Sequence, residues 1–93
     1  MIKGVAATIC YTAFDYSSGI GRTGDAANHT LRLVRDGSEI TPTNSPSEVD
    51  STNCPGLYKI TLTAAEMNAD YIALSGKSST SGVSIVPTEV ATS

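Results

Sequence analysis

Basic residues are scarce in this sequence, and they do not cluster. Six lysines and arginines stand against nine acidic residues, which gives the 93-residue chain a net charge of −3. Proteins that grip nucleic-acid phosphates gather basic side chains in order to displace counterions. The closest basic pair here, Arg32 and Arg35, lies beside Asp36 and Glu39. We therefore expect no nucleic-acid partner.

Cysteine and histidine are also rare. The chain has two cysteines, Cys10 and Cys54, and a single histidine, His29. Two cysteines are too few for a disulfide scaffold, and this set cannot supply the four ligands of a Cys/His zinc site. The sequence predicts no metal and no cofactor, and it favours free thiols in a product made in the cytoplasm.

Long hydrophobic runs are absent. Residues 1–14, MIKGVAATICYTAF, superficially resemble a signal peptide, but Thr8 and Thr12 interrupt the apolar stretch and no clear cleavage site follows. No segment approaches the ~18 apolar residues of a membrane span. We expect a soluble chain with no membrane partner.

Alternation of apolar and polar residues is what the sequence does contain, together with many hydroxyl groups. Serine and threonine supply 24 of the 93 residues, a composition that suits strands and turns with exposed faces. The dipeptide Asp36-Gly37 predicts a tight hairpin into residues 38–41. Pro87 suggests a sheet edge or a bulge.

The expected strands are residues 5–14, with Val5, Ala7, Ile9, Tyr11 and Ala13 on one face; 29–36, with Leu31 and Leu33 inward; 57–63, with Tyr58, Ile60 and Leu62 on one face; 70–77, with Ile72 and Leu74 inward; and 82–90, with Val83 and Ile85 inward.

The polar segment that precedes residues 57–63 is rich in proline, serine, asparagine and aspartate. We interpret residues 44–56 as turn chemistry that leads into a strand. Beyond that strand, Thr63 and Glu66 have the spacing of a capping box, followed by one or two helical turns. This capped turn would carry the chain from one sheet to the other.

These elements predict one domain over residues 1–93 and an all-β fold. The expected architecture is a small antiparallel immunoglobulin-like β-sandwich of about six or seven strands, with one short helical turn near residues 64–68.

Three local patterns invite a chemical reading, and for each we favour a structural one. Residues 19–24, GIGRTG, spell G-x-G-x-x-G, but the chain lacks room for a dinucleotide fold and the stretch fits a mobile loop better. His29 has Asp25 nearby, yet nothing in the sequence indicates a nucleophile beside it. Cys54 has no cation near it in the sequence. We predict no catalytic residue and no enzyme.

Aromatic residues are few, and tryptophan is absent. Tyr11 and Tyr58 fall on core-facing positions. The remaining candidates for an exposed surface that contacts protein or glycan are Phe14, Tyr16 and Tyr71.

Three blocks of the sequence together resemble a module of tailed-bacteriophage virion structural proteins. They are GRTGDAANHTLRLVRDG, NSPSEVDSTNCPGLYKITLTAAEMNAD and LSGKSSTSGVSIVPTEV, and the resemblance runs from about Arg22 to Val90. In that group a TGD-type loop leads into a KDG hairpin. A P-S-E-V-D-x-T-N-x-P-G-x-Y-K passage then enters a strand, and a GKSS turn precedes the last strand. Cys54 departs from the small residue expected at its position.

The resemblance implies a non-enzymatic virion protein with an immunoglobulin-like fold, made in the host cytoplasm. A small capsid decoration, head-fibre or tail accessory protein fits, present in multiple copies or as a homo-oligomer and bound to other capsid or tail proteins. The alternative is a carbohydrate-binding module that attaches to a host-surface glycan. The resemblance assigns no functional residues.

Overall fold

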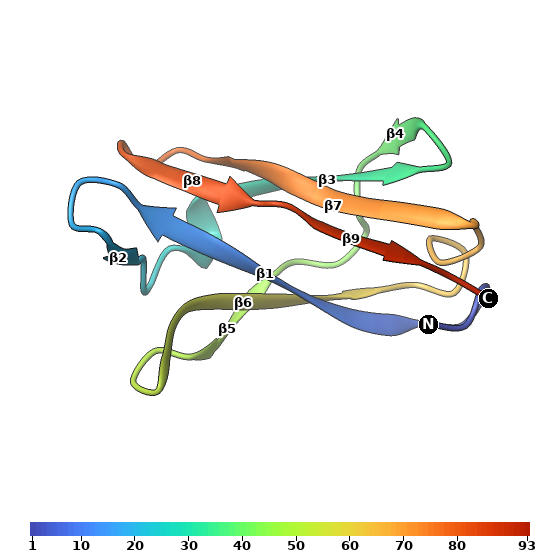
Figure 1. Cartoon of the computed structure of the whole chain (residues 1–93), viewed down its shortest axis with the longest axis horizontal. Helices are drawn as coiled ribbons and strands as arrows, with labels where there is room; N and C mark the ends of the chain where they lie inside the picture. Colours follow the sequence, from blue (N-terminus) through green and yellow to red (C-terminus); the bar gives the residue numbers. More distant parts are fainter.

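Two antiparallel β-sheets packed face to face form the protein, and the computed structural model describes all 93 residues (Figure 1). The all-β sandwich prediction is confirmed. The only helix is a three-residue 3₁₀ helix, η1 (Ala26–Asn28). The first sheet contains β1 (Ala7–Asp15), β2 (Ile20–Gly21), β5 (Ser47–Asp50), β6 (Cys54–Leu62) and β8 (Val83–Val86); the second contains β3 (His29–Arg35), β4 (Ser38–Ile40), β7 (Tyr71–Ser78) and β9 (Thr88–Ala91).

The order of the strands follows the immunoglobulin-like plan. In the first sheet β5, β6 and β1 lie in the order of immunoglobulin strands D, E and B, and in the second β4, β3, β7 and β9 lie in the order C′, C, F and G. Strand A has no counterpart, and β8 pairs with β1 in its place. If β8 and β9 count as one interrupted strand and the two-residue β2 is set aside, the sandwich has seven strands, as predicted.

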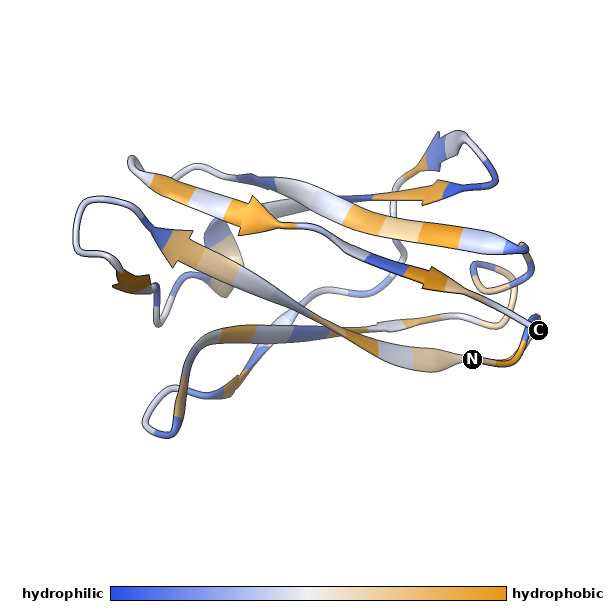
Figure 2. Cartoon of the chain, viewed as in Figure 1, coloured by the Kyte–Doolittle hydropathy of each residue, from blue (hydrophilic) through white to orange (hydrophobic).

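The core lies between the sheets and comes from the alternation seen in the sequence. Figure 2 shows hydrophobic bands that alternate with hydrophilic ones along the strands. Each large aliphatic side chain that is fully buried here stabilises the fold by roughly 1.5–3 kcal/mol relative to exposure. Fourteen buried residues form one cluster: Ile9, Tyr11, Ala13, Leu31, Leu33, Tyr58, Ile60, Leu62, Met67, Ala69, Ile72, Leu74, Val83 and Ile85.

Pro87 marks the point at which the last strand changes sheets. Upstream of it, β8 pairs with β1 in the first sheet, and downstream β9 pairs with β7 in the second. Proline has no amide to donate to a ladder, which explains why pairing breaks there. The hydroxyl of Thr88 then donates to the carbonyl of Cys10 at 2.6 Å. The segment from β8 to β9 therefore connects the two sheets along one side of the sandwich.

The Asp36-Gly37 hairpin is confirmed. Both residues have positive φ, 46° and 88°, as a type I′ turn requires. The Asp36 carboxylate also accepts hydrogen bonds from the amides of Asp70 and Tyr71, so the turn is tied to the start of β7.

The capping box is confirmed, although no regular helix follows it. The Thr63 amide donates to a Glu66 carboxylate oxygen at 2.8 Å, and the Glu66 amide donates to the Thr63 hydroxyl at 3.2 Å. A single bond from the Met67 amide to the Thr63 carbonyl closes one turn. This segment carries the chain from β6 in the first sheet to β7 in the second, as predicted.

The structure has no helix with the length and hydrophobicity that a membrane crossing requires.

Two boundary predictions are wrong. Residues 47–50 form strand β5, and β6 begins at Cys54, so the polar segment is partly strand and its turn is confined to residues 51–53. An edge strand can be polar on both faces, so the residues of β5 do not show the alternation of apolar and polar residues that predicts a strand. Val5 is 51% exposed because the chain turns away before β1 and the terminal residues bond to each other, the Lys3 amide to the Ser93 carbonyl.

Candidate functional site

Two of the three predicted contact residues lie together at the end of β1. The rings of Phe14 and Tyr16 meet edge to face, with centroids 5.1 Å apart and planes at 76°. Tyr16 is 66% exposed, and Phe14 is half-buried. Tyr71 is exposed too, but it begins β7 at the opposite end of the sandwich (Figure 1). The three residues therefore do not form a single surface.

Strand pairing adds two apolar residues to the aromatic pair. Thr12 lies opposite Leu57 of β6 on one side and opposite Val86 of β8 on the other, two positions from Phe14 on the same face of β1. Val86 is 44% exposed. Diagonal neighbours at this spacing are within reach of an aromatic side chain. We call Phe14, Tyr16, Leu57 and Val86 the Phe14 face.

Sequence reasoning missed Leu57 and Val86. A signal was present, because both are apolar residues on outward positions of strands whose inward positions were assigned correctly. What the sequence lacks is the register that places both beside β1. Farther along the outer surface of this sheet, Cys10 lies opposite Lys59, and the hydroxyls of Thr8 and Thr61 are hydrogen-bonded at 3.1 Å.

A buried polar cluster surrounds Asp25, which is 1% exposed. Four side chains donate hydrogen bonds to its two carboxylate oxygens: Asn28, His29, Ser78 and Thr80. Burial by itself would raise the pKa of Asp25, but these hydrogen bonds outweigh burial and lower the pKa to about 2. The cluster ties η1 and β3 to β7 and to the loop after it.

His29 is enclosed within this cluster. Its Nε2 lies 3.0 Å from Asp25 Oδ2, and its Nδ1 lies 2.7 Å from the hydroxyl of Tyr11. An ionised carboxylate only accepts, so Nε2 carries a proton and Nδ1 accepts from Tyr11 in the neutral ring. The imidazole has no exposed surface. Ser78 bonds to Asp25 rather than to the histidine, so the arrangement lacks the nucleophile-to-base contact of a hydrolytic triad.

Tyr58 extends the cluster across the core. Its hydroxyl donates to the Arg22 carbonyl at 2.6 Å and accepts from the Asp25 amide at 3.0 Å. Tyr11 stacks on it with ring centroids 5.7 Å apart. Burial raises the pKa of Tyr11, which keeps its hydroxyl protonated as a donor to His29. The prediction that both tyrosines are core residues is confirmed.

The G-x-G-x-x-G stretch has a packing role. Ile20 and Gly21 form β2, which pairs with β1, and the Arg22 amide bonds to the Ala13 carbonyl, so the first half of the segment is paired rather than an open loop. A Cβ on Gly21 would lie 2.1 Å from the carbonyl oxygen of Pro55. Glycine is required by this close approach between β2 and β6. The three-residue η1 that follows is not the long helix that a dinucleotide site uses.

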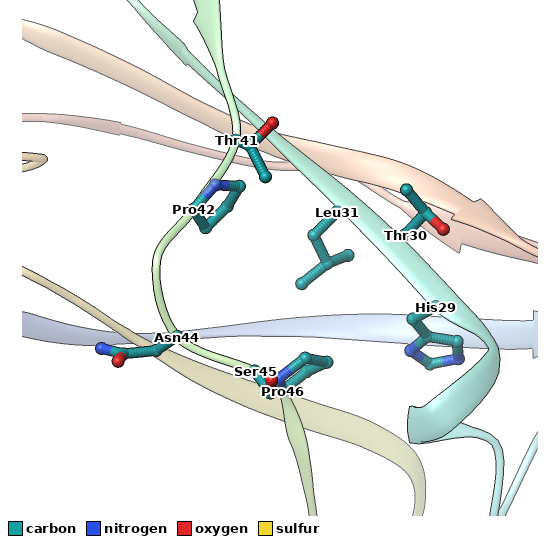
Figure 3. A pocket seen from close by; sticks show the side chains of 8 residues that line it. All are labelled: His29, Thr30, Leu31, Thr41, Pro42, Asn44, Ser45 and Pro46. Carbon is teal, nitrogen blue, oxygen red and sulfur yellow. The ribbon is translucent and has the colours of Figure 1, made fainter.

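A hollow of about 220 Å³ opens beside β3 (Figure 3). It lies between this strand and the segment that links β4 to β5. Leu31 is its only hydrophobic lining residue, and no lysine, arginine, aspartate or glutamate lines it. The lining residues are His29, Thr30, Leu31, Thr41, Pro42, Asn44, Ser45 and Pro46.

Cys10 and Cys54 are both exposed and unpaired, and no group of three potential ligands is placed to hold a metal ion. Comparison of the chain with protein-family models, with curated proteins and with solved structures finds no match.

Proposed function

We propose that this protein is a non-enzymatic structural component of a tailed-phage virion. It would serve as a small capsid decoration, head-fibre or tail accessory protein that acts through protein–protein contacts. The resemblance of residues 22–90 to virion modules supports the setting. The observation that carries the contact role is the aromatic pair on the Phe14 face, in which the exposed Tyr16 packs against the half-buried Phe14.

The Phe14 face has the composition of a protein interface. Aromatic side chains are enriched in the buried centres of interfaces, and they carry much of the binding free energy. Leu57 and Val86 extend the apolar area on neighbouring strands, so the centre is held by a sheet rather than by a loop. Thr12 lies between Leu57 and Val86, and Ser84 lies opposite Phe14, so hydroxyl groups border the apolar area as a polar rim would.

The buried acid–base groups support a non-enzymatic role. The imidazole of His29 is enclosed, and both its nitrogens bond within the protein. The carboxylates of Asp25 and Glu66 are buried and accept hydrogen bonds from this chain's own groups. These groups maintain the fold: His29 lines the hollow beside β3, but its imidazole has no exposed surface.

If many copies of the protein bind to one particle, a small contact area for each copy is enough to keep them attached. An apolar centre of four residues is modest for a permanent interface. Many copies on a symmetric particle raise the effective concentration of each contact, so weak individual binding still yields full occupancy.

Purified virions test this proposal. We expect mass spectrometry to find the protein at a fixed ratio to the major capsid or tail protein. Recombinant protein should rebind to particles that lack it. Tyr16→Asp should weaken rebinding by about tenfold or more, because it places a charge in the apolar centre. The matched control is Tyr71→Asp, an exposed tyrosine at the other end. Absence of the protein from virions, or equal effects of the two variants, would contradict the proposal.

Carbohydrate binding is the alternative that the same variants address. A sugar-binding surface usually offers a flat aromatic platform, whereas Phe14 and Tyr16 stand at 76° to each other. Binding to a host polysaccharide on a glycan array, lost in Tyr16→Ala, combined with no rebinding to particles, would favour the alternative.

A further inference from the structure

Strand β3 is paired along its whole length on one side only. It pairs with β7 from His29 to Arg35, whereas β4 covers only Leu33 to Arg35. Residues 29–32 therefore have an edge with no neighbouring strand. The hollow of about 220 Å³ lies along this edge.

The direction of the backbone groups in β3 follows from hydrogen bonds at its two ends. The Asp36 amide bonds to the Tyr71 carbonyl, and the Asn28 carbonyl accepts from Ser79, so even-numbered positions face β7. Odd-numbered positions face the other side, because backbone groups alternate along a strand. The His29 amide is already bonded to the Ala26 carbonyl. What remains free at the edge is the carbonyl of His29 and both the amide and the carbonyl of Leu31.

Proline explains why β4 stops before it covers these groups. Leu33 lies opposite Ile40, so a continued β4 would place Pro42 opposite Leu31. Pro42 has no amide to donate to the Leu31 carbonyl. After Ile40 the chain instead turns away from β3 toward the first sheet. There the Thr43 amide donates to Glu66, in the connection after β6, and the Asn44 side chain donates to the Thr61 carbonyl of β6. The strand position beside Leu31 is left open (Figure 3).

We propose that this position binds a short extended peptide segment of a partner protein, which adds to β3 in line with β4. One peptide residue would exchange two hydrogen bonds with Leu31, and the residue two positions along would donate to the His29 carbonyl. The uncharged lining of Thr30, Thr41 and Ser45 selects a neutral segment with small side chains. The hollow lies below the ~300 Å³ at which drug-sized pockets begin, which suits a few residues of backbone.

This peptide site goes beyond the proposed function. It lies at the edge of the second sheet, whereas the Phe14 face lies on the outside of the first sheet, so either contact can exist without the other. Strand addition supplies affinity through main-chain bonds, and the small hollow supplies the selectivity.

Selection from a displayed library of random heptapeptides on the folded full chain tests the peptide site. We expect selected peptides to be neutral, with small residues and without proline at the two pairing positions. In ¹⁵N spectra a synthetic selected peptide should shift the Leu31 amide signal and slow its hydrogen exchange. Ser45→Tyr, which fills the hollow, should weaken binding by about tenfold or more. Ser38→Tyr, on β4 but outside the hollow, is the matched control and should leave binding unchanged.

Pro42→Thr gives an independent check, since it restores the missing amide. We expect β4 to extend, the Leu31 amide to become protected without peptide, and peptide binding to fall. The proposal is overturned if no peptide is selected, if selected peptides bind Ser45→Tyr as well as wild type, or if neutral monosaccharides rather than peptides shift the Leu31 amide.

Discussion

Two carboxylates are buried at opposite ends of the sandwich, and each holds its end together in a different way. Asp25 lies beside η1, and Glu66 lies in the connection from β6 to β7 (Figure 1). Asp25 accepts only side-chain donors, two of which, Ser78 and Thr80, are 53 and 55 positions away. Glu66 accepts two backbone amides, one of them from Thr63, three positions before it.

The difference lies in what must form first. At both ends burial would raise the pKa of the carboxyl group, and hydrogen bonds outweigh it and lower the pKa. The Asp25 donors come together only when β3 has paired with β7 in the second sheet, where His29 lies opposite Ser78, so this end depends on a long-range strand pairing. The Thr63–Glu66 bonds need one turn of chain, so the Glu66 end is partly a local structure.

Replacement of Asp25 should give the largest loss of stability. Asp25→Ala removes the acceptor of four donors, of which His29 is buried, Ser78 and Thr80 are half-buried and Asn28 is exposed. Each unsatisfied buried group costs ~1–3 kcal/mol. We expect the free energy of unfolding in urea to fall by about 3 kcal/mol or more. Asp25→Asn keeps the shape and one carbonyl acceptor and should fall between wild type and alanine. A loss below about 1 kcal/mol for alanine would mean that water satisfies these donors and that the two ends do not differ as described.

The sequence was sufficient for the Glu66 end and for most strands because their signals are local. Period-two alternation placed Tyr58, Ile60 and Leu62 in the core, and Asp36-Gly37 specified its own turn type. Val5 continued the alternation but lies outside β1, since alternation alone does not say where pairing ends. Strand β5 was missed because an exposed edge strand needs no apolar face.

The Asp25 cluster and the Phe14 face were not predictable because their partners are brought together by the fold. Nothing near Asp25 in the sequence indicates Ser78, and nothing near Phe14 indicates Val86. Phe14 and Tyr16 were identified as candidate surface aromatics from their own positions, and of the two Tyr16 is exposed and Phe14 half-buried. Tyr71 was grouped with them because the sequence does not say at which end of a sandwich a strand begins.

Acid titration should separate the two ends further. The folded pKa of Asp25, about 2, lies below the ordinary value of 3.8, so ionised Asp25 stabilises the fold at pH values above about 4. This contribution is lost as the pH falls from about 4 to about 2. Because each pKa unit corresponds to ~1.4 kcal/mol, we expect a loss of about 2 kcal/mol over that window. Urea midpoints measured from pH 5 to pH 2 would record it. Asp25→Asn should flatten most of the slope and Glu66→Gln a smaller part; an unchanged slope in Asp25→Asn would rule out this assignment.

Replacement of Glu66 should lower the free energy of unfolding less than either the replacement of Asp25 or its protonation at low pH. Glu66→Ala leaves the amides of Thr43 and Thr63 without their acceptor, but Thr43 is exposed and Thr63 half-buried, so water can replace the carboxylate. We expect a loss of about 1 kcal/mol, the usual value for a missing cap. Hydrogen exchange of the Thr43 amide should quicken, because the β4–β5 segment loses this bond to the other sheet. Glu66→Gln, which retains one acceptor, is the matched control. Since the two carboxylates share no partner, Asp25→Ala and Glu66→Ala should add in the double variant. A coupling well beyond ~0.5 kcal/mol would show that the ends are not independent, and that the local turn at Glu66 forms only with the sheets around it.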